Sequence, residues 1–529
     1  MPCSPECELP TLRGKATVRS AQTGTAEHSP AIGDRNRAGR TALAASLVLL
    51  LGSLAFFVCF AGLYPNPCID ESFFNFPAIS YLKGHGFFYI VSSQAPFWRT
   101  LWSYHGPFFP HLQVLVFWLF GVSQQVSRVP NLLAGYLAAS LMAYLLMRAG
   151  WKVAPLVFTL TWLGDRAPQE LQHARMDGIA LLLVVLGFTM LNRFYAEPNM
   201  RNAFCVAFCT FAAVGFHPVT AYFFVLSAGT LCILAYKRGC LPRSLSGFGC
   251  GFAVVALAVL AFVQFHPIEG LQQFRWWLRV VSEPAQKAQL SDLLFTIRWS
   301  KWFFLVLAGF TVFAAMPIAL IQLRKLRGDR IESESFFKLS LALFSLAGAV
   351  CLINQAVYPY YILYFSIWPI ALLAVEAEQL PRQKRPLVLS IAVAAILFVA
   401  WVPSAAWNAL RIREEVLYRK QLTHNYILGR LRQSLPANAK VSGDPSIYML
   451  AAEANLDFTP APWNANYSPV DRPDVPQDEW LLLTEKEYAN PKYFFPSDVR
   501  GRSVAFCENA FPGAKHLDFD VCLLRPLVQ

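Results

Sequence analysis

The sequence predicts an α-helical polytopic membrane protein that ends in a small α/β domain. Of its 529 residues, 55% are hydrophobic and 14% aromatic, whereas only 15% are charged, and the mean hydropathy is +0.40. A soluble domain normally carries about 25% charged residues. These values exclude a disordered chain, a collagen-like fibre and a small disulfide scaffold, and they disfavour an ordinary soluble enzyme.

The basic charge of the chain follows the pattern of membrane orientation. The net charge is +12, but residues 405–529 hold 14 Lys and Arg against 15 Asp and Glu, so the remainder carries +13. Those charges lie between apolar segments, as the positive-inside rule describes, and do not gather on a phosphate-binding face. We therefore expect membrane lipids, and no nucleic acid, as partners.

Eleven segments are apolar enough to be predicted as membrane spans, each of which needs about 20 residues for a full crossing. The first follows a polar tail, residues 1–40, and is too long for the apolar core of a signal peptide, so it is a predicted anchor. Several segments are short, which is tolerated where a cavity inside the bundle receives the freed backbone groups. The predicted spans are 41–63, 129–147, 153–163, 179–192, 203–216, 219–236, 245–265, 302–323, 339–353, 362–375 and 387–402.

Charge also decides the status of residues 105–120, an apolar stretch broken by two prolines. If this stretch does not cross, the segments on one side hold 21 Lys and Arg and the opposite loops hold nine. The positive-inside rule then predicts a cytoplasmic N-terminus in the inner (plasma) membrane, with a first outer loop at 64–127 and a transmembrane domain over 41–403. Residues 105–120 become a helix that lies on or dips into the outer surface.

The C-terminal region, 404–529, is predicted to be a separate extracytoplasmic α/β domain. Residues 411–435 and 446–455 read as helices, and 440–443, 480–484 and 519–524 read as strands. Cys507 and Cys522 are the two cysteines of this region and are expected to form a disulfide in an oxidising compartment. The chain has no CxxC pair, and nothing in the sequence requires a metal or another cofactor.

Polar residues that are able to carry chemistry follow the first span. Asp70 and Glu71 are adjacent carboxylates at a predicted helix boundary, where such charges are costly unless water or a partner receives them. A solvated helix boundary is the simpler interpretation. The following loop, however, is rich in aromatic residues, His and Arg, including His105, and these side chains are typical of sites that bind sugars and phosphates.

Three further clusters are predicted on the same face. Arg175 and Asp177 precede an apolar run, His217 stands between two spans, and Tyr361 lies in an aromatic group before the tenth span. Each has a simpler explanation: an ion pair, a capping histidine and an aromatic belt. Four polar clusters on one face of a bundle are stronger evidence for a site than any one of them.

These residues resemble the motifs of the bacterial protein-mannosyltransferase-like glycosyltransferases. That superfamily includes eukaryotic protein O-mannosyltransferases, the aminoarabinose transferase of lipid A and the Rgt-type lipopolysaccharide glycosyltransferases. The resemblance covers about residues 41–402 by layout. The matching positions are Asp70-Glu71-Ser72, Gly84 and Gly86, Tyr104-His105-Gly106-Pro107, Gly121, Arg128, Ala174-Arg175-Met176-Asp177 and Tyr360-Tyr361-Ile362-Leu363. Met176 and Tyr364 stand where the family frequently has proline.

The resemblance implies a GT-C fold and a reaction at the outer membrane surface. A sugar would pass, with inversion, from a polyprenyl-phosphate-linked donor to the hydroxyl of a glycan, lipid or protein acceptor. Asp70 would be the general base, and Glu71 and Asp177 would orient the base or the acceptor. The candidates for binding the leaving phosphate are His105, Arg175, His217 and Tyr361.

Two other functions remain open at this point. A polytopic transporter or a lipid flippase of envelope precursors commonly shows inverted repeats and charges in mid-span, whereas here the acidic residues lie at helix ends and no repeat is evident. An assembly factor for envelope polysaccharide would use the outer domain for binding. Replacement of Asp70 by Asn separates these functions, because only an enzyme loses turnover.

Overall fold

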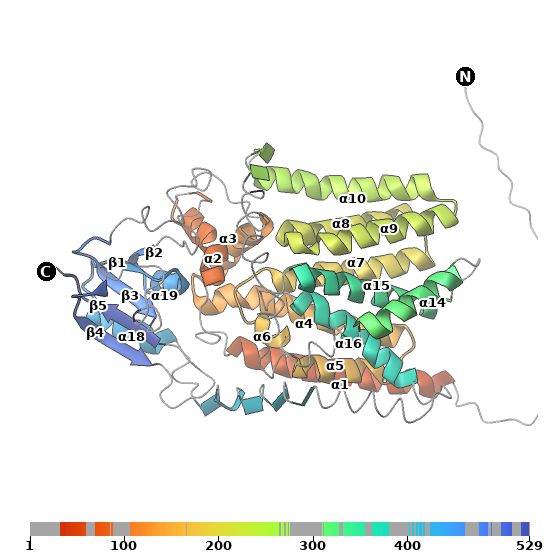
Figure 1. The fold of residues 1–529 in the computed structure, drawn as a ribbon, viewed down its shortest axis with the longest axis horizontal. Helices are drawn as coiled ribbons and strands as arrows, with labels where there is room; N and C mark the ends of the chain where they lie inside the picture. The colour runs from red at the N-terminus through yellow and green to blue at the C-terminus, as the bar shows by residue number, and fades with distance from the viewer. Residues whose placement is uncertain are drawn as a thin grey trace, which may run out of the picture.

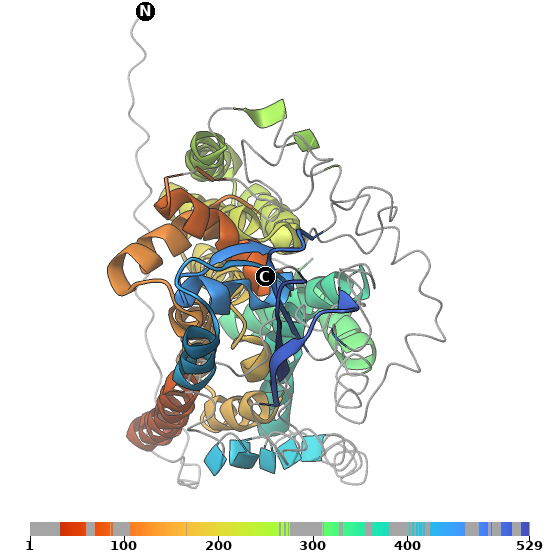
Figure 2. The same ribbon diagram turned by 90° about the vertical axis from the view of Figure 1, so that its left-hand side faces the viewer.

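The computed structural model describes residues 32–59, 69–84, 106–165, 167–263, 311–326, 332–354, 362–379, 424–460, 475–484, 499–509 and 520–527, with single residues and short turns between these ranges. The described chain is mostly helical. Long helices lie side by side in a bundle, and a small sheet is placed at one end of it (Figure 1). Figure 2 views the molecule from that end, which we call the sheet end of the bundle.

Seven of the described helices are long and apolar enough to cross a membrane. The predicted count of about eleven is not confirmed, because α5 (Ala154–Gly164), with 11 residues, and α8 (Met200–Phe216), with 17, rise only ~16 and ~26 Å against a ~30 Å hydrocarbon core. The span predicted at 302–323 is described only in part, as η4 (Thr311–Ala315) and α14 (Met316–Leu326), which fall short of the length of a crossing helix. The last predicted span, 387–402, lies outside the described residues apart from its final two. The seven long helices are α1 (Ile32–Cys59), α4 (Gln124–Arg148), α7 (Asp177–Ala196), α9 (Ala221–Lys237) with the turn η2 (Pro218–Thr220), α10 (Leu241–Phe262), α15 (Ser333–Asn354) and α16 (Ile362–Gln379).

Small residues allow α8 to pack closely against α10. A Cβ atom on Gly247 would lie 2.3 Å from the carbonyl oxygen of Met200, and one on Gly251 would lie 2.4 Å from that of Phe204. These partners are backbone atoms, which cannot rotate away. The two glycines, one helical turn apart, therefore set the spacing of the two helices.

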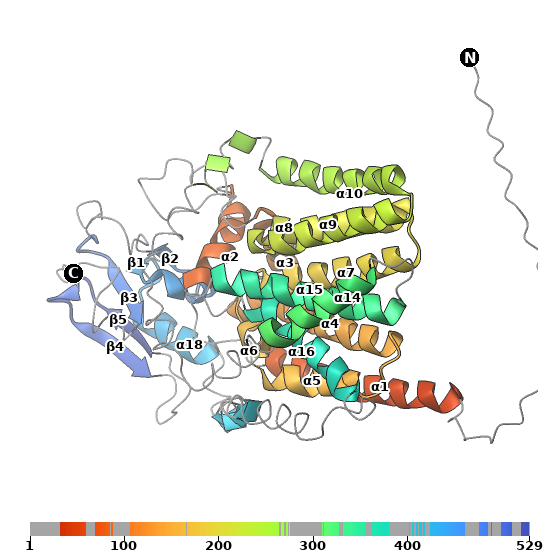
Figure 3. The same cartoon turned by 45° about the vertical axis from the view of Figure 1, so that its right-hand side comes forward.

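Two short helices, α2 (Ile69–Leu82) and α3 (Phe108–Phe120), occupy the sheet end of the bundle (Figure 3). The predicted helix at 105–120 is confirmed as α3. The helix α2 was not predicted, because its residues were assigned to the outer loop at 64–127. The two acidic residues of its first turn favour a helix N-terminus, and Phe74 packs edge to face on Phe109 of α3 with ring centroids 6.2 Å apart.

The sheet has five strands in the order β2-β1-β3-β5-β4. Strand β1 (Lys440–Gly443) is parallel to its two neighbours, β2 (Asp457–Pro460) and β3 (Trp480–Thr484). Strand β5 (Asp520–Leu524) is antiparallel to β3 and to β4 (Val504–Asn509). The strands predicted at 440–443, 480–484 and 519–524 are confirmed to within a residue. Strand β2 was missed, and β4 was predicted only as a strand-like stretch around Cys507, without bounds. The described part of the helix predicted at 411–435 includes α18 (His424–Ser434), and that at 446–455 is η7 (Pro445–Ile447) followed by α19 (Tyr448–Glu453).

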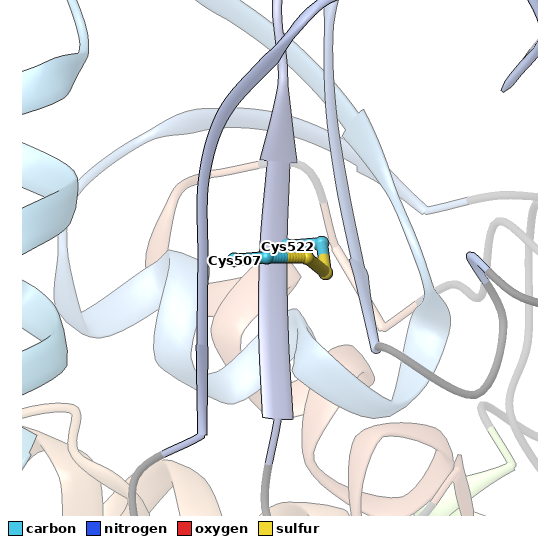
Figure 4. Close-up of a disulfide and its surroundings, with 2 residues drawn as sticks. All are labelled: Cys507 and Cys522. Atoms are coloured by element: carbon cyan, nitrogen blue, oxygen red, sulfur yellow. A yellow bond between two sulfur atoms is a disulfide. The ribbon is translucent and has the colours of Figure 1, made fainter.

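The predicted disulfide between Cys507 and Cys522 is present (Figure 4). The two residues face each other in the β4–β5 register, and their Cα atoms are 4.1 Å apart. The bond ties the edge strand β4 to the interior of the sheet.

Candidate functional site

The candidate site lies where several helices end at the sheet end of the bundle. Asp70 and Glu71 are in the first turn of α2, and Asp177 begins α7. His217 follows the last residue of α8, and Tyr364 is in the first turn of α16. The predicted placement of Asp70 and Asp177 on one side of the bundle is confirmed, because Arg175 contacts both carboxylates.

Glu71 is completely buried and its carboxylate is saturated with hydrogen bonds. Arg128 donates from Nε to Oε1 (2.9 Å) and from Nη2 to Oε2 (2.8 Å). The side chain of Gln124 donates to Oε2 (2.9 Å), and the backbone N–H of Ala174 donates to Oε1 (2.6 Å). Burial raises the pKa of Glu71, but the charge of Arg128 and the hydrogen bonds outweigh it and lower that pKa to about 2. Glu71 thus joins α2 to α4 and to the segment before α7.

Arg175 links the two other carboxylates of the site. Its Nε donates to Oδ2 of Asp177 (2.7 Å), its Nη1 donates to Oδ2 of Asp70, and its guanidinium lies over the ring of Phe74, 5.1 Å from the ring centre. The Arg175 side chain is only 2% exposed, and that of Asp177 only 1%. The guanidinium therefore fixes the position of Asp70 relative to α7.

Asp177 also contacts Tyr364 of α16 and His217, which follows α8. Its Oδ1 accepts a hydrogen bond from the hydroxyl of Tyr364 (3.1 Å), and Nε2 of His217 lies 4.0 Å from the same oxygen. Nδ1 of His217 faces the backbone N–H of Val219 at 3.4 Å, which favours the tautomer that carries its proton on Nε2. Burial lowers the pKa of His217 to about 4, so the ring is neutral near pH 7.

The segment that carries Arg175 is fixed from the side of α4. Asn131 of α4 donates from Nδ2 to the carbonyl oxygens of Leu171 and His173 (3.0 Å each), and its Oδ1 accepts from the backbone N–H of Gly178 (2.5 Å). A Cβ atom on Gly178 would lie 2.2 Å from the backbone oxygen of Asn131. The close approach of α7 to α4 therefore requires glycine at this position.

Of the site carboxylates described here, Asp70 alone is partly open to solvent. Its side chain is 29% exposed, compared with 0% for Glu71 and 1% for Asp177. The difference follows from helix geometry, because consecutive residues of a helix point about 100° apart. The adjacent carboxylates predicted as one pair thus face different surroundings, Arg128 for Glu71 and Arg175 for Asp70.

The structure joins four of the seven predicted site residues in one side-chain network: Asp70, Arg175, Asp177 and His217. Glu71 lies next to it in a second cluster with Arg128 and Gln124. His105 and Tyr361 lie outside the described residues. Sequence reasoning did not assign Gln124, Asn131 or Tyr364 to the site, and it noted Arg128 only as part of a motif. Asn131 and Tyr364 lie near the first residue of the predicted spans 129–147 and 362–375. A polar side chain at such a position is the sequence feature from which both residues were predictable.

Comparisons with known proteins give no match to this chain, either among protein-family models or among curated proteins. Within the residues that the structure describes, no group of three or more His, Cys, Asp or Glu side chains is placed to hold a metal ion.

Proposed function

We propose that the protein is a membrane glycosyltransferase with a polyprenyl-phosphate-linked sugar as donor and an acceptor hydroxyl as nucleophile, in which Asp70 is the general base. The observation that carries the proposal is the contrast between Asp70 and its neighbours. Asp70 is held by Arg175 yet partly exposed, whereas Glu71 and Asp177 are buried and bonded. A general base must be fixed in position and must also come within hydrogen-bond reach of its substrate.

The proposed reaction is a single inverting displacement. The acceptor oxygen forms a bond to the anomeric carbon, the bond from that carbon to the phosphate oxygen breaks, and polyprenyl phosphate leaves with the bonding electrons. The hydroxyl proton passes to the carboxylate of Asp70. One enzymatic carboxylate is sufficient, because the phosphate is a good leaving group.

The neighbouring residues would position this base. Arg175 has Nη1 on Asp70 and Nε on Asp177, so it orients the Asp70 carboxylate from a buried site. The sequence-based expectation that Arg175 binds the leaving phosphate stays a prediction. His217 is neutral near pH 7, so its proposed part in phosphate binding is that of a hydrogen-bond donor and not of a cation.

The test is the release of polyprenyl phosphate from a radiolabelled lipid-linked sugar by membranes that contain Asp70→Asn. The amide keeps the shape of the carboxylate but cannot take up the proton, so turnover should fall by about 10²–10⁴-fold. The matched control is Asp478→Asn, the same change at an exposed residue before β3, which should leave turnover unchanged. Full activity of Asp70→Asn at equal expression would refute the mechanism, and transport of the lipid without its cleavage would instead favour the transporter.

A further inference from the structure

The short helix α2 carries Asp70 and is buried over most of its length, with Tyr81 and Leu82 exposed at its end. All side chains described between Glu71 and Ser80 are buried. A helix of 14 residues is marginal by itself, so α2 depends on its packing against other elements. Helices α3 and α4 and the segment before α7 cover part of α2.

The C-terminal domain covers another part of α2 through residues 445–453, which we call the docking segment. This segment comprises η7 and α19 and contacts α2, and Figure 1 labels α19 and α2. The ring of Tyr448 packs against the ring of Phe76, with centroids 4.7 Å apart and the ring planes tilted by 51°. Tyr448 and Met449 belong to the same buried apolar cluster as Phe74 and Met176, and Met176 is the residue between Arg175 and Asp177.

A line of hydrogen bonds runs from the docking segment to the site. Oε2 of Glu453 accepts from the backbone N–H of Gln124 (3.2 Å), and the side chain of Gln124 donates to Oε2 of Glu71 (2.9 Å). Glu71 is the neighbour of Asp70 in the first turn of α2. The docking segment therefore contacts apolar residues of α2. It also contacts Gln124, whose side chain donates to the buried carboxylate of Glu71.

The docking segment is in turn fixed to the sheet. Asp444, directly after β1, accepts hydrogen bonds from the backbone N–H (2.8 Å) and the hydroxyl (2.7 Å) of Ser446 and from the hydroxyl of Thr484 at the end of β3 (3.2 Å). The start of the segment is thus tied to two parallel strands and cannot shift independently of the sheet.

We propose that the docking segment, through Tyr448 and Glu453, positions α2 and thereby Asp70, so that the C-terminal domain is part of the catalytic architecture and not only a binding module. The effect on turnover rests on the proposed function of Asp70. The effect on the order of α2 does not, because it follows from packing alone.

The test measures hydrogen–deuterium exchange and kinetics on the full-length protein in lipid nanodiscs. Tyr448→Ala removes the ring on Phe76, and α2 amides should exchange about 100-fold faster, because a truncated core aromatic weakens local protection. Tyr448→Phe keeps the ring and should exchange like the parent protein. Amides of α15, far from the docking segment in the chain, report global unfolding and should be unchanged.

Glu453→Ala is the second variant, since it removes little apolar surface, and Glu453→Gln keeps an acceptor for the Gln124 N–H. Loss of this bond should speed exchange in α2 by about tenfold and lower kcat, with the acceptor KM unchanged. The proposal is overturned if α2 exchange is unchanged in both Ala variants, or if the acceptor KM rises at constant kcat. If Asp70→Asn retains turnover, the proposed function fails, and the exchange data still decide whether the segment orders α2.

Discussion

Replacement of Glu71 by Gln should destabilise the protein strongly near neutral pH. The carboxylate accepts four hydrogen bonds, two of them from Arg128, and neither side chain of this pair is exposed. The neutral amide of the variant would leave the guanidinium of Arg128 without its counter-charge. Removal of one member of a buried ion pair typically costs about 3–5 kcal/mol of unfolding free energy.

The pH dependence of this loss has a defined sign. The pKa of Glu71 is lowered from 4.5 to about 2 in the folded protein. Its contribution to the free energy of unfolding is therefore fully present above pH 4.5 and is lost as the pH falls towards 2. At 1.36 kcal/mol per unit of pKa, the ionised Glu71 stabilises the fold by about 3 kcal/mol in total. About 2 kcal/mol of this stabilisation is lost when the pH falls to about 3. The stability gap between the parent protein and Glu71→Gln should therefore narrow in acid.

The assay is reversible unfolding of the detergent-solubilised protein in denaturant at about pH 7 and about pH 3. Asp478→Asn, at an exposed position, is the control and should match the parent protein at both values. A gap that is the same at both pH values would show that the charge of Glu71 does not stabilise the fold, and the assignment of Glu71 as the residue that holds α2 would then be wrong.

Three further predictions concern topology, the disulfide and the site. Reporter fusions at Lys325 and Asn438 should read cytoplasmic and extracytoplasmic respectively, and equal readings would contradict the orientation derived from loop charge. Thiol labelling of the denatured, unreduced protein should modify neither Cys507 nor Cys522, and a Cys522→Ser variant should lose about 3 kcal/mol of unfolding free energy, since the closed loop spans 15 residues. Gly178→Ala should cost about 1–3 kcal/mol in the same denaturation assay, because its methyl group would meet backbone at 2.2 Å, and a neutral result would show that α7 can move away from α4.

The sequence was sufficient to locate most of the charged residues of the site. Asp70, Arg175, Asp177 and His217 were found because each stands at the end of an apolar segment, and the loop charges placed these ends on one face. The contacts of Arg175 with both carboxylates confirm that placement. The periodicity of strands in the C-terminal domain was also sufficient for three of the five strands.

Other features depend on tertiary contacts that no local pattern encodes. Asp70 and Glu71 have different surroundings because they begin a helix, and these residues were predicted to lie in the outer loop at 64–127. Tyr364 reads as an ordinary aromatic residue of an apolar span until its hydroxyl is seen on Asp177. The strand β2 has only four residues and is defined by its pairing with β1.

The charges at the centre of the site explain why Asp70 is the exposed carboxylate. Glu71 and Arg128 form a neutral buried pair, while the single cation Arg175 is shared by Asp177 and Asp70. With every group in its charged form, these five residues carry one surplus negative charge. A buried charge is costly unless it is paired. The carboxylate with the unpaired negative charge is therefore expected to contact water, and Asp70, at 29% exposure, is the one that does. Uptake of a proton by Asp70 would bring the five residues to neutrality without breaking the Glu71–Arg128 or Arg175–Asp177 pairs. The fold can thus keep its buried charges paired throughout the proton transfer that we propose for Asp70.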